Sequence, residues 1–573
     1  MKWVHTMFIL KRFNEMKKNI ILIGLLFFVL GLNAQDKRPN IIFILTDDQP
    51  YDYLSCTGNQ VVTTPNIDKL ADQGTLFTNA HITSPICMPS RVSMLMSQFE
   101  RKHGVNFNSG TALSEKAWEN SYPVLMKKAG YFTAYIGKNH TPLGKNGYKS
   151  EVMENAFDYF YAGHRHLGFY PKDKHEIFKG AKNDTQIEII EEATFDALDN
   201  NEFRLKEAIK VMEGRPDDKP FLLNICFNLP HGAGTSSMKQ KEGDDDIYKS
   251  LFRNQEIPLP DHYIAKKDIK TPKLSNELLH AEDRQYIYDY VDTPEGTRER
   301  LIRQYQSMVG IDRMVGHLRK KLSELHLDKN TIIIFSSDHG LLMGQYGLGG
   351  KALLYEYCTK VSTIVYDPRI KKNKVQHMND ALVQSIDIAP TILANANVEI
   401  PSTYQGKDIS SLLTSNDKSV RDFLYTENLW STQFGNPRCE AVQNKEWKYI
   451  RYYKNENFSA KKRIEYAKAM GINVNSVLYG MNDKEIPIYR SFAEGSLKGD
   501  QPVYEELYHL LVDPSEMKNL AEDDQYKNKL EELRSVWQKE ITKARGTGQP
   551  LVERFTKESS FEYQKNHPVL IHD

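Results

Sequence analysis

A cysteine followed closely by proline, serine and arginine is the segment of this sequence best suited to chemistry. It reads Ser84-Pro85-Ile86-Cys87-Met88-Pro89-Ser90-Arg91. At a helix start, Arg91 would lie one turn beyond Cys87, because residues four apart share a helix face. A nearby cation favours a reactive cysteine, so the pattern predicts an activated thiol or a thiol that is modified. A buried, inert cysteine is the competing interpretation.

Two further pairs of residues suggest a metal site. Asp47 and Asp48 are adjacent carboxylates, and Asp338 is followed by His339. Three carboxylates brought together repel one another unless a cation lies among them. Oxygen ligands suit a hard ion such as calcium or magnesium, and the His339 nitrogen suits it less well. The competing interpretation is that Asp47 caps a helix and His339 lies in a loop.

The elements that would position these residues are four short apolar runs typical of buried parallel strands. They are Asn40–Leu45, Phe132–Ile136, Phe221–Phe227 and Thr331–Phe335. Each runs into polar residues: Thr46-Asp47-Asp48, Gly137-Lys138-Asn139-His140, Asn228-Leu229-Pro230-His231 and Ser336-Ser337-Asp338-His339-Gly340. Because the carboxyl ends of parallel strands line the ligand crevice, we expect these polar residues to converge on one rim.

Helical patterns alternate with the strands. Thr64–Gly74 and Arg298–Leu325 carry apolar residues at helical spacing. This alternation predicts an α/β fold with a mostly parallel central sheet flanked by helices. Residues 236–297 are polar and loop-like, which indicates an insertion over the site or surface decoration.

A second region begins near Tyr425. Residues 447–451 have a strand-like pattern, and Asn528–Ala544 has the pattern of a closing helix. We therefore expect a catalytic domain over residues 35–424 and a smaller C-terminal α+β subdomain over residues 425–573, packed on the main domain.

Residues 1–34 have the pattern of a signal peptide. Lys17-Lys18 precede the apolar run Ile20–Leu32, which is followed by Asn33-Ala34. Met16 is a candidate alternative start. The run is too short to span a bilayer comfortably, although an N-terminal anchor is the competing interpretation. We expect export to the periplasm or medium, with no membrane attachment after cleavage; no cysteine follows the cut, so a lipoprotein is not expected.

Composition excludes several classes of protein. The 573 residues are 40% hydrophobic, which is too apolar for wholesale disorder. Lys+Arg and Asp+Glu both total 75, so the chain lacks the basic excess of a nucleic-acid binder. With 5 cysteines it is no disulfide scaffold. Besides Cys87 these are Cys56, Cys226, Cys358 and Cys439, whose three possible pairings the sequence leaves open, although Cys226 lies in an apolar strand and is expected to be a core thiol.

Together these motifs resemble the formylglycine-dependent (type I) sulfatases of the alkaline-phosphatase-like superfamily. Cys87-Met88-Pro89-Ser90-Arg91 matches the C-x-P-S-R signature of that family, and the resemblance runs from about residue 38 to 545. The other matching segments, in family order, are Arg38 to Asp48, Thr64 to Ala71, Gly137 to His140, Pro230-His231, Ser337 to Gly340, Lys351 with Tyr355-Glu356, and Glu506 to Leu520.

The resemblance implies that a formylglycine-generating enzyme oxidises Cys87 to formylglycine (3-oxoalanine). One hydroxyl of the aldehyde hydrate attacks the ester sulfur, and the other lets the carbon expel sulfate. It also implies one Ca²⁺, with Mg²⁺ less expected, bound by Asp47, Asp48, Asp338, His339 and modified Cys87.

The remaining roles also follow from the resemblance. Arg91 stabilises the ionised hydrate, Lys138 and Lys351 bind sulfate oxygens, His140 assists proton transfer at the hydrate, and His231 protonates the leaving oxygen. For Lys351 an ordinary glycine loop, Gly349-Gly350-Lys351, is the competing interpretation.

One segment departs from the family pattern. Where members have Leu-Thr-Gly-Arg after the signature, this chain has Leu95-Met96-Ser97-Gln98. That stretch helps the modifying enzyme, so the departure bears on the efficiency of modification or the class of enzyme that performs it. The Asp-His form of the last metal pair, where many members have Asp-Asn, is a smaller departure.

The substrate is the least determined feature. Residues 157–170 combine aromatic residues with His164, Arg165 and His166, which suits a sulfated sugar; a packed loop with a solvated edge is the competing interpretation. The expected reaction is hydrolysis of sulfate esters of a poly- or oligosaccharide. The alternatives are a phosphate or phosphonate monoester hydrolase of the same superfamily, and a non-catalytic glycan binder in which Cys87 stays a thiol.

Overall fold

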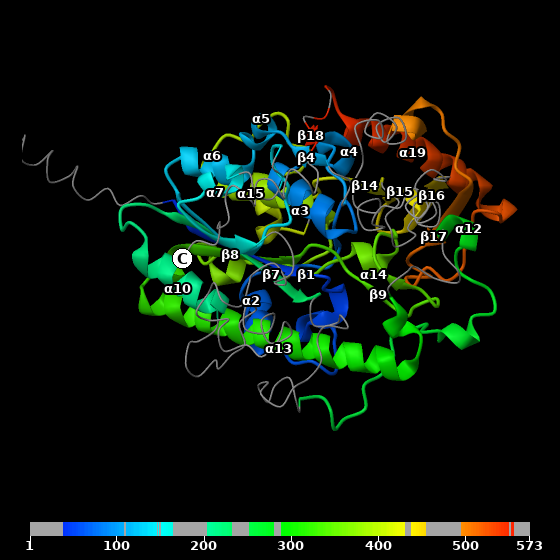
Figure 1. Cartoon of the computed structure of the whole chain (residues 1–573), viewed down its shortest axis with the longest axis horizontal. Helices are drawn as coiled ribbons and strands as arrows, with labels where there is room; N and C mark the ends of the chain where they lie inside the picture. Colours follow the sequence, from blue (N-terminus) through cyan, green and yellow to red (C-terminus); the bar gives the residue numbers. More distant parts are fainter. Residues whose placement is uncertain are drawn as a thin grey trace, which may run out of the picture.

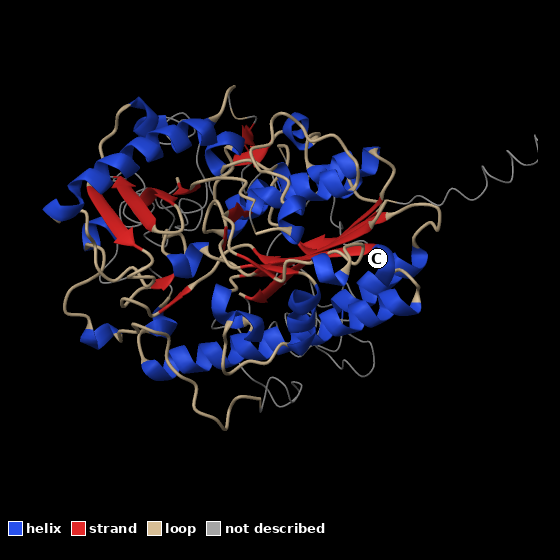
Figure 2. Cartoon of the chain, turned by 180° about the vertical axis from the view of Figure 1, so that it is seen from behind, coloured by secondary structure: helices blue, strands red, loops and turns tan. Residues whose placement is uncertain are grey.

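An eight-stranded, mostly parallel sheet forms the centre of the molecule (Figures 1 and 2). The computed structural model describes residues 38–554 except 108–110, 146, 148–150, 164–202, 232–250, 280–287, 417, 430–436, 454–493, 549 and 551. In the described chain the strand order is β12-β2-β11-β8-β1-β7-β5-β6. The strands are β1 Asn40–Asp47, β2 Thr75–Phe77, β5 Phe132–Lys138, β6 Tyr159–Gly163, β7 Phe221–Pro230, β8 Thr331–Ser337, β11 Thr363–Tyr366 and β12 Met378–Asn379.

The four predicted strands are neighbours in the parallel part of this sheet. β1 lies between β7 and β8, and β5 pairs with β7, all in parallel register. Each strand continues two or three residues beyond its apolar run, so that β1 ends at Asp47 and β5 at Lys138. The predicted α/β fold is confirmed.

Helices cover both faces of the sheet, and alternate residues of β1 contact the two resulting cores. Ile41, Phe43 and Leu45 pack in one core, and Ile42 and Ile44 in the other. Figure 1 shows α3, α6 and α15 above the sheet and α2, α10 and α13 below it. These helices are α2 Pro65–Gln73, α3 Cys87–Met96, α6 Tyr122–Lys128, α10 Phe203–Gly214, α13 Pro294–Glu324 and α15 Ile388–Asn395. No helix in the described residues is long and apolar enough to cross a membrane.

A separate four-stranded antiparallel sheet follows toward the C-terminus, as expected for an α+β subdomain. Its strands are β14 Leu424–Asn428, β15 Arg438–Gln443, β16 Trp447–Tyr453 and β17 Tyr504–His509. Helix α19, Lys527–Arg545, packs on this sheet through Leu533, Trp537 and Ile541. Figure 2 shows the two sheets side by side in the molecule. The domain boundary at residues 424 and 425 stays a prediction.

Short elements complete the described chain. They are β3 Ala80–His81, β4 Thr111–Leu113, β9 Leu342–Met343, β10 Gly349–Gly350, β13 Val383–Gln384, β18 Val552–Arg554, α4 Glu100–His103, α5 Glu115–Trp118, α7 Val152–Asn155, α12 Asn276–Leu279 and α14 Glu356–Thr359, together with 3-10 turns such as η7 Asp289–Val291. Part of the predicted insertion, residues 251–279, is mostly loop.

Candidate active site

The carboxyl ends of the central strands bring the predicted polar residues to one rim. Asp47 is the last residue of β1 and pairs in register with Pro230, the last residue of β7. Asp338 directly follows β8, and its backbone N–H donates to the Thr46 carbonyl. The His231 N–H donates to the Asp47 carbonyl. The rim therefore forms because parallel strands present their ends at the same edge.

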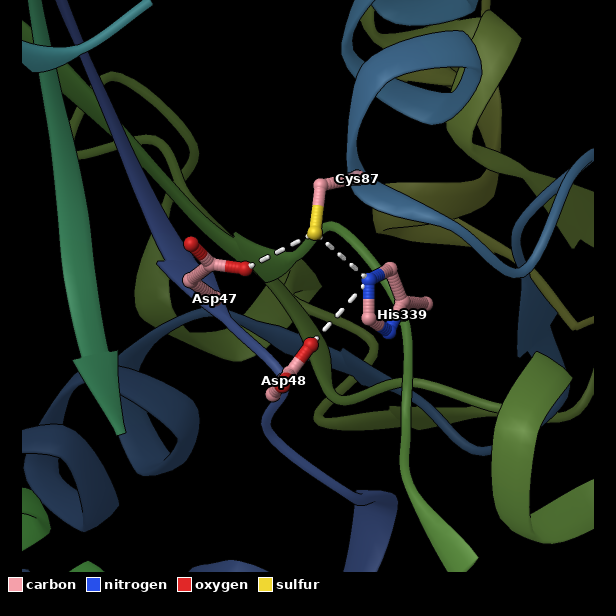
Figure 3. A group of neighbouring side chains, drawn as sticks. All are labelled: Asp47, Asp48, Cys87 and His339. Atoms are coloured by element: carbon pink, nitrogen blue, oxygen red, sulfur yellow. Dashed lines mark hydrogen bonds and ion pairs between the residues drawn. The ribbon is translucent and has the colours of Figure 1, made fainter. Parts of the chain in front are cut away.

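Cys87 is the first residue of α3, and its side chain points toward Asp47 and His339 (Figure 3). Its sulfur lies 3.4 Å from Asp47 Oδ1, 3.2 Å from His339 Nε2 and 3.0 Å from Lys351 Nζ. Ligand atoms of Asp47, Asp48, Cys87 and His339 all lie within 4.8 Å of one another, and all four residues are buried. A helix start places the Cys87 side chain where residues from three different strands and loops converge.

The environment of Cys87 does not activate its thiol. Burial and the Asp47 carboxylate raise the pKa of Cys87 to about 12, although Lys138 and Lys351 act in the opposite direction. An unmodified side chain is therefore a neutral thiol at physiological pH, and a thiol is a weak nucleophile compared with a thiolate. Of the interpretations from sequence, this argues against an activated thiol and leaves a modified cysteine and an inert one.

Arg91 lies one turn into α3, as the spacing predicted, and joins the helix to the strand ends. Its Nε donates to Asp338 Oδ2 at 2.8 Å, and a second nitrogen donates to the Lys138 carbonyl at 2.9 Å. Burial alone would lower the pKa of Arg91, but Asp338 and Asp47 raise it well above its usual value. The guanidinium is thus a fixed positive charge in the site.

Two lysines supply further positive charge. Lys138 forms an ion pair with Asp47, and Lys351 Nζ lies 2.8 Å from Asp48 Oδ1. Burial and Asp338 act to raise the pKa of Asp47, but Lys138 and Arg91 outweigh them and lower it. Burial acts to lower the pKa of Lys351, whereas Asp48 and Cys87 raise it well above its usual value. The Gly349-Gly350-Lys351 loop therefore belongs to the site.

The donor set fits a hard divalent cation. Three carboxylates, Asp47, Asp48 and Asp338, are at most 2% exposed, and carboxylate oxygens are the ligands that calcium and magnesium prefer. Their charges are balanced by Arg91, Lys138 and Lys351, so a divalent ion would give the site a net charge of about +2. Asp338 lies beside the compact group: its Oδ1 is 3.6 Å from His339 Nε2, and its Oδ2 faces Arg91.

Of the two other histidines with predicted roles, His231 lies beside Asp48 and His140 lies against Phe107. His231 Nε2 is 3.6 Å from Asp48 Oδ2, so His231 borders the cluster. His140 is buried, has a positive φ of 44°, and its ring meets the Phe107 ring edge-on at 5.9 Å. Asp48 shares this left-handed backbone conformation, with a φ of 59°.

The predicted substrate-binding residues His164, Arg165 and His166 lie outside the described residues. The preceding part of that stretch is structural. Tyr159–Gly163 form β6, which pairs with β5. The rings of Phe157 and Phe160 pack on Tyr135 at 5.4 Å and 5.9 Å. Residues 157–163 are therefore packed in or against the sheet, in line with the competing interpretation of this stretch as a packed segment.

Sequence reasoning did not assign a role to Ser90, Gln49 or Ser337. The Ser90 hydroxyl donates to the Asp338 carbonyl at 2.6 Å and so ties α3 to β8. The Gln49 N–H donates to Ser337 Oγ at 3.2 Å and joins the ends of β1 and β8. In the sequence, only their position next to the motif residues indicated a role for these three residues. Their contacts could not be predicted, because they depend on how the strands pair.

The departure from the family signature has a structural counterpart. Ser97 caps α3 in a left-handed conformation, with a φ of 52°. Its hydroxyl donates to the Ile386 carbonyl at 2.7 Å and accepts from the Gly406 N–H at 3.1 Å. These two hydrogen bonds offset the cost of a side chain at a position that favours glycine.

All five cysteines are free thiols in the structure, so none of the three possible pairings forms. Cys226 lies in β7 and is 2% exposed, as expected for a core thiol.

Comparison with known proteins identifies the class. The family model described as Sulfatase matches residues 39–398, and the model described as N-sulphoglucosamine sulphohydrolase, C-terminal, matches residues 344–462. The chain belongs to the sulfatase family, within the alkaline-phosphatase-like superfamily. It is a sulfuric ester hydrolase.

Individual relatives are similar over most of their length. An arylsulfatase of Clostridium perfringens is 24% identical over 529 residues, covering 88% of this chain and 94% of that protein. An N-acetylglucosamine-6-O-sulfatase of Bacteroides thetaiotaomicron is 24% identical, covering 87% and 85%.

Two solved structures share the fold. BT4656, in complex with its substrate D-glucosamine-2-N,6-O-disulfate, has a TM-score of 0.60 at 21% identity and covers 89% of this chain and 98% of its own. A phosphonate monoester hydrolase of Silicibacter pomeroyi has a TM-score of 0.63 at 17% identity, covering 88% and 95%.

Proposed function

We propose that this enzyme hydrolyses sulfate esters of a sulfated carbohydrate, with Cys87 converted to formylglycine. The observation that carries this proposal is the position of Cys87. It begins a buried helix, and its sulfur lies within 3.4 Å of Asp47, His339 and Lys351. A formylglycine hydrate at this position supplies a hydroxyl nucleophile and a carbon that can later release sulfate.

The residues of the rim bind the metal ion in this proposal. Asp47, Asp48, His339 and the position of Cys87 form the compact group, and Asp338 lies at its border. The carboxylate oxygens favour Ca²⁺ over a softer metal, and Mg²⁺ is the second choice. A bound divalent cation supplies positive charge against the sulfate oxygens.

The fixed cations of the chain bind and orient the sulfate ester. Lys351 Nζ lies 3.0 Å from the Cys87 sulfur, within reach of any group that reacts there. Lys138 and Arg91 hold Asp47 and Asp338 ionised and add further positive charge to the site. Preorganised charges of this kind stabilise a transition state more than mobile ones, because they need no reorganisation.

The two histidines move protons. His231 borders Asp48 and is 17% exposed at its side chain, so it can meet a leaving alcohol at the mouth of the site and protonate it. His140 takes the proton of the hydrate. These roles follow the family resemblance and the position of each residue on the rim.

A sulfated sugar is the proposed substrate, for two reasons. Relatives that match over more than four-fifths of this chain include an N-acetylglucosamine-6-O-sulfatase, and BT4656 binds a sulfated glucosamine. The basic and apolar pattern of residues 1–34 fits export to the periplasm or medium, where sulfated polysaccharides are met. His164, Arg165 and His166 remain proposed contacts to this sugar, and a formylglycine-generating enzyme the proposed maturation partner.

A parallel assay of three ester classes tests the proposal. Purified enzyme is given sulfated mono- and oligosaccharides, phosphate monoesters and phosphonate monoesters, and released sulfate and phosphate are measured. We expect sulfate release from at least one sulfated sugar to be fastest. Faster hydrolysis of a phosphate or phosphonate ester would instead establish the alternative that the phosphonate monoester hydrolase fold leaves open.

The mass of the Cys87 peptide separates the enzyme from a glycan-binding protein. Conversion to the aldehyde replaces the thiol with a carbonyl oxygen and lowers the peptide mass. We expect the lower mass in active enzyme and no turnover in Cys87→Ala. Full activity with an intact thiol would contradict the formylglycine proposal.

A further inference from the structure

A tyrosine hydroxyl near the catalytic groups is buried and has no hydrogen-bond partner among the described residues. It belongs to Tyr290, in the turn η7 that precedes α13. A buried hydroxyl without a partner costs stability, because it gives up its hydrogen bonds to water. Native proteins keep few such groups, and each calls for a functional explanation.

The turn that carries Tyr290 lies against the loop of the catalytic lysine. Gly350 directly precedes Lys351, and a Cβ added to Gly350 would fall 2.2 Å from the ring of Tyr288. The ring of Tyr288 therefore rests on the backbone of that glycine. The Tyr290 ring meets the Tyr288 ring edge-on, with 5.9 Å between centroids.

Charged residues of the site influence the pKa of Tyr290. Burial raises the pKa of its hydroxyl to about 12, and the charges of Arg300, Asp48 and Lys351 all act on that pKa. Tyr290 is thus within electrostatic range of the lysine and the carboxylate that border Cys87. At neutral pH its hydroxyl is protonated and can donate a hydrogen bond.

Neighbouring groups hold the Tyr290 ring in place. The Arg300 guanidinium lies over the ring, 3.9 Å from its centroid. The turn is fixed on both sides: Tyr263 Oη donates to the Val291 carbonyl at 2.9 Å, and Thr293 caps α13 by accepting from the Gly296 N–H at 3.1 Å. A rigid donor of this kind provides direction at small entropic cost.

We propose that Tyr290 is a substrate-binding residue, whose hydroxyl donates a hydrogen bond to a hydroxyl or ring oxygen of the sulfated sugar, and that Arg300 positions its ring. This inference rests on the proposed function and adds a specificity contact to the same site.

The chemistry of Tyr290 suits the sugar better than the sulfate. Lys138 and Lys351 already supply charge for the sulfate oxygens. A neutral phenol adds little charge but imposes direction, which is what recognition of a sugar hydroxyl requires. The flat ring also offers an apolar face or edge to the sugar.

The variant Tyr290→Phe tests this role with glucosamine 6-sulfate, N-acetylglucosamine 6-sulfate and galactose 6-sulfate as substrates and inorganic sulfate as a competitive inhibitor. We expect kcat/KM for the preferred sugar sulfate to fall about 10- to 100-fold, because one hydrogen bond to the substrate is lost. The inhibition constant of sulfate should change less than about twofold, since the anion site is intact. The Tm should stay the same or rise, because the variant removes an unpartnered buried hydroxyl.

Tyr404→Phe is the matched control. The Tyr404 hydroxyl is also buried but donates to the Asn120 carbonyl at 2.8 Å, so its removal should lower Tm and leave kcat/KM unchanged. Unchanged kcat/KM for the sugar sulfate in Tyr290→Phe would overturn the inference. Equal weakening of sugar and sulfate binding would also overturn it, as would a lower Tm accompanied by equal losses in kcat/KM and sulfate binding. A wild-type enzyme that hydrolyses no sulfated mono- or oligosaccharide, in this panel or in the wider assay of three ester classes, would refute the proposed function itself, before the variant is made.

Discussion

Charge balance is the main property of the site at the scale of residues. Asp47, Asp48 and Asp338 are buried, and Arg91, Lys138 and Lys351 face them at ion-pair distance. Buried charges are tolerated only when they are paired. The same cations that stabilise the carboxylates also make the site attractive to a sulfate ester, so stability and binding depend on the same residues.

Lys351→Met should inactivate the enzyme. The substitution removes the cation beside both Asp48 and Cys87, and we expect kcat/KM on the best sulfate ester to fall by at least about 100-fold, or about 3 kcal/mol. Steady-state kinetics measure the loss. Lys372→Met, at an exposed lysine, is the control and should match wild type. A loss below about tenfold would remove Lys351 from the sulfate-binding role.

Metal removal should abolish activity without unfolding the protein. The carboxylates keep Arg91, Lys138 and Lys351 as partners, so a chelator should stop turnover while the thermal transition stays cooperative at a lower Tm. Activity and Tm are measured after chelation and after adding back Ca²⁺ or Mg²⁺. We expect Ca²⁺ to restore more activity. Full activity after exhaustive chelation would contradict the metal site.

At the scale of elements, helix α4 holds the segment that leads into α3. Glu100 Oε2 accepts from Ser84 Oγ at 2.7 Å, and Glu100 Oε1 accepts from Asn106 Nδ2 at 2.5 Å. Ser84 lies three residues before Cys87, so this carboxyl group helps to set where α3 begins. Burial and the nearby Glu427 raise the pKa of Glu100 to about 8.

The contribution of Glu100 to stability should therefore decrease as pH rises from about 5 to 8, whereas His103, whose pKa burial lowers to about 3, acts in the opposite direction up to its unfolded-state pKa of 6.5. The folded state keeps a proton on Glu100 that the unfolded state, with a pKa of 4.5, has lost, so raising the pH favours unfolding by at most about 1.4 kcal/mol per pH unit for this group. Glu100→Gln removes this titration, so over that range we expect the free energy of unfolding of the variant to change with pH by a more positive slope than that of wild type. Denaturant titrations at several pH values measure it.

Glu115→Gln, at an exposed glutamate of α5, is the control and should keep the wild-type slope. Other buried acids with raised pKa, such as Glu516 at about 7, should leave part of the slope in both variants. Parallel curves for wild type and Glu100→Gln would show that Glu100 is ionised in the folded protein.

At the scale of the whole molecule, a buried arginine connects the two sheets. Arg101, on helix α4 that follows α3, lies 3.0 Å from Glu427 of β14 and 2.5 Å from Glu440 of β15. Trp537 of α19 also donates to Glu440. The C-terminal sheet is thus joined to α4, the helix next to α3, by a fully buried ion network.

Arg101→Met should destabilise the protein strongly. It leaves two buried carboxylates without their cation, for which we expect a loss of about 3–5 kcal/mol in the free energy of unfolding. Arg534→Met is the control: Arg534 pairs with Glu505, its side chain is 34% exposed, and the loss should stay below about 1 kcal/mol. Equal losses in denaturant titrations would show that the buried network adds nothing beyond a surface pair.

The sequence by itself predicted the strands, the main helices and the polar residues that gather at one rim of the sheet. Apolar runs identify buried strands because a parallel sheet is covered on both faces, and the residues after Leu45, Ile136, Phe227 and Phe335 fall at one edge by the geometry of such a sheet. The position of Arg91 one turn beyond Cys87 also follows from helix geometry alone.

The tertiary structure alone decided which groups touch. The pairing of Arg91 with Asp338, the Glu100 contact to Ser84 and the place of Tyr290 beside Lys351's loop join segments separated by tens to hundreds of residues. Contacts at such separations depend on how the layers pack, and no local propensity encodes them. The raised pKa of Cys87 is likewise a property of burial, which a side chain acquires only when the surrounding chain excludes water.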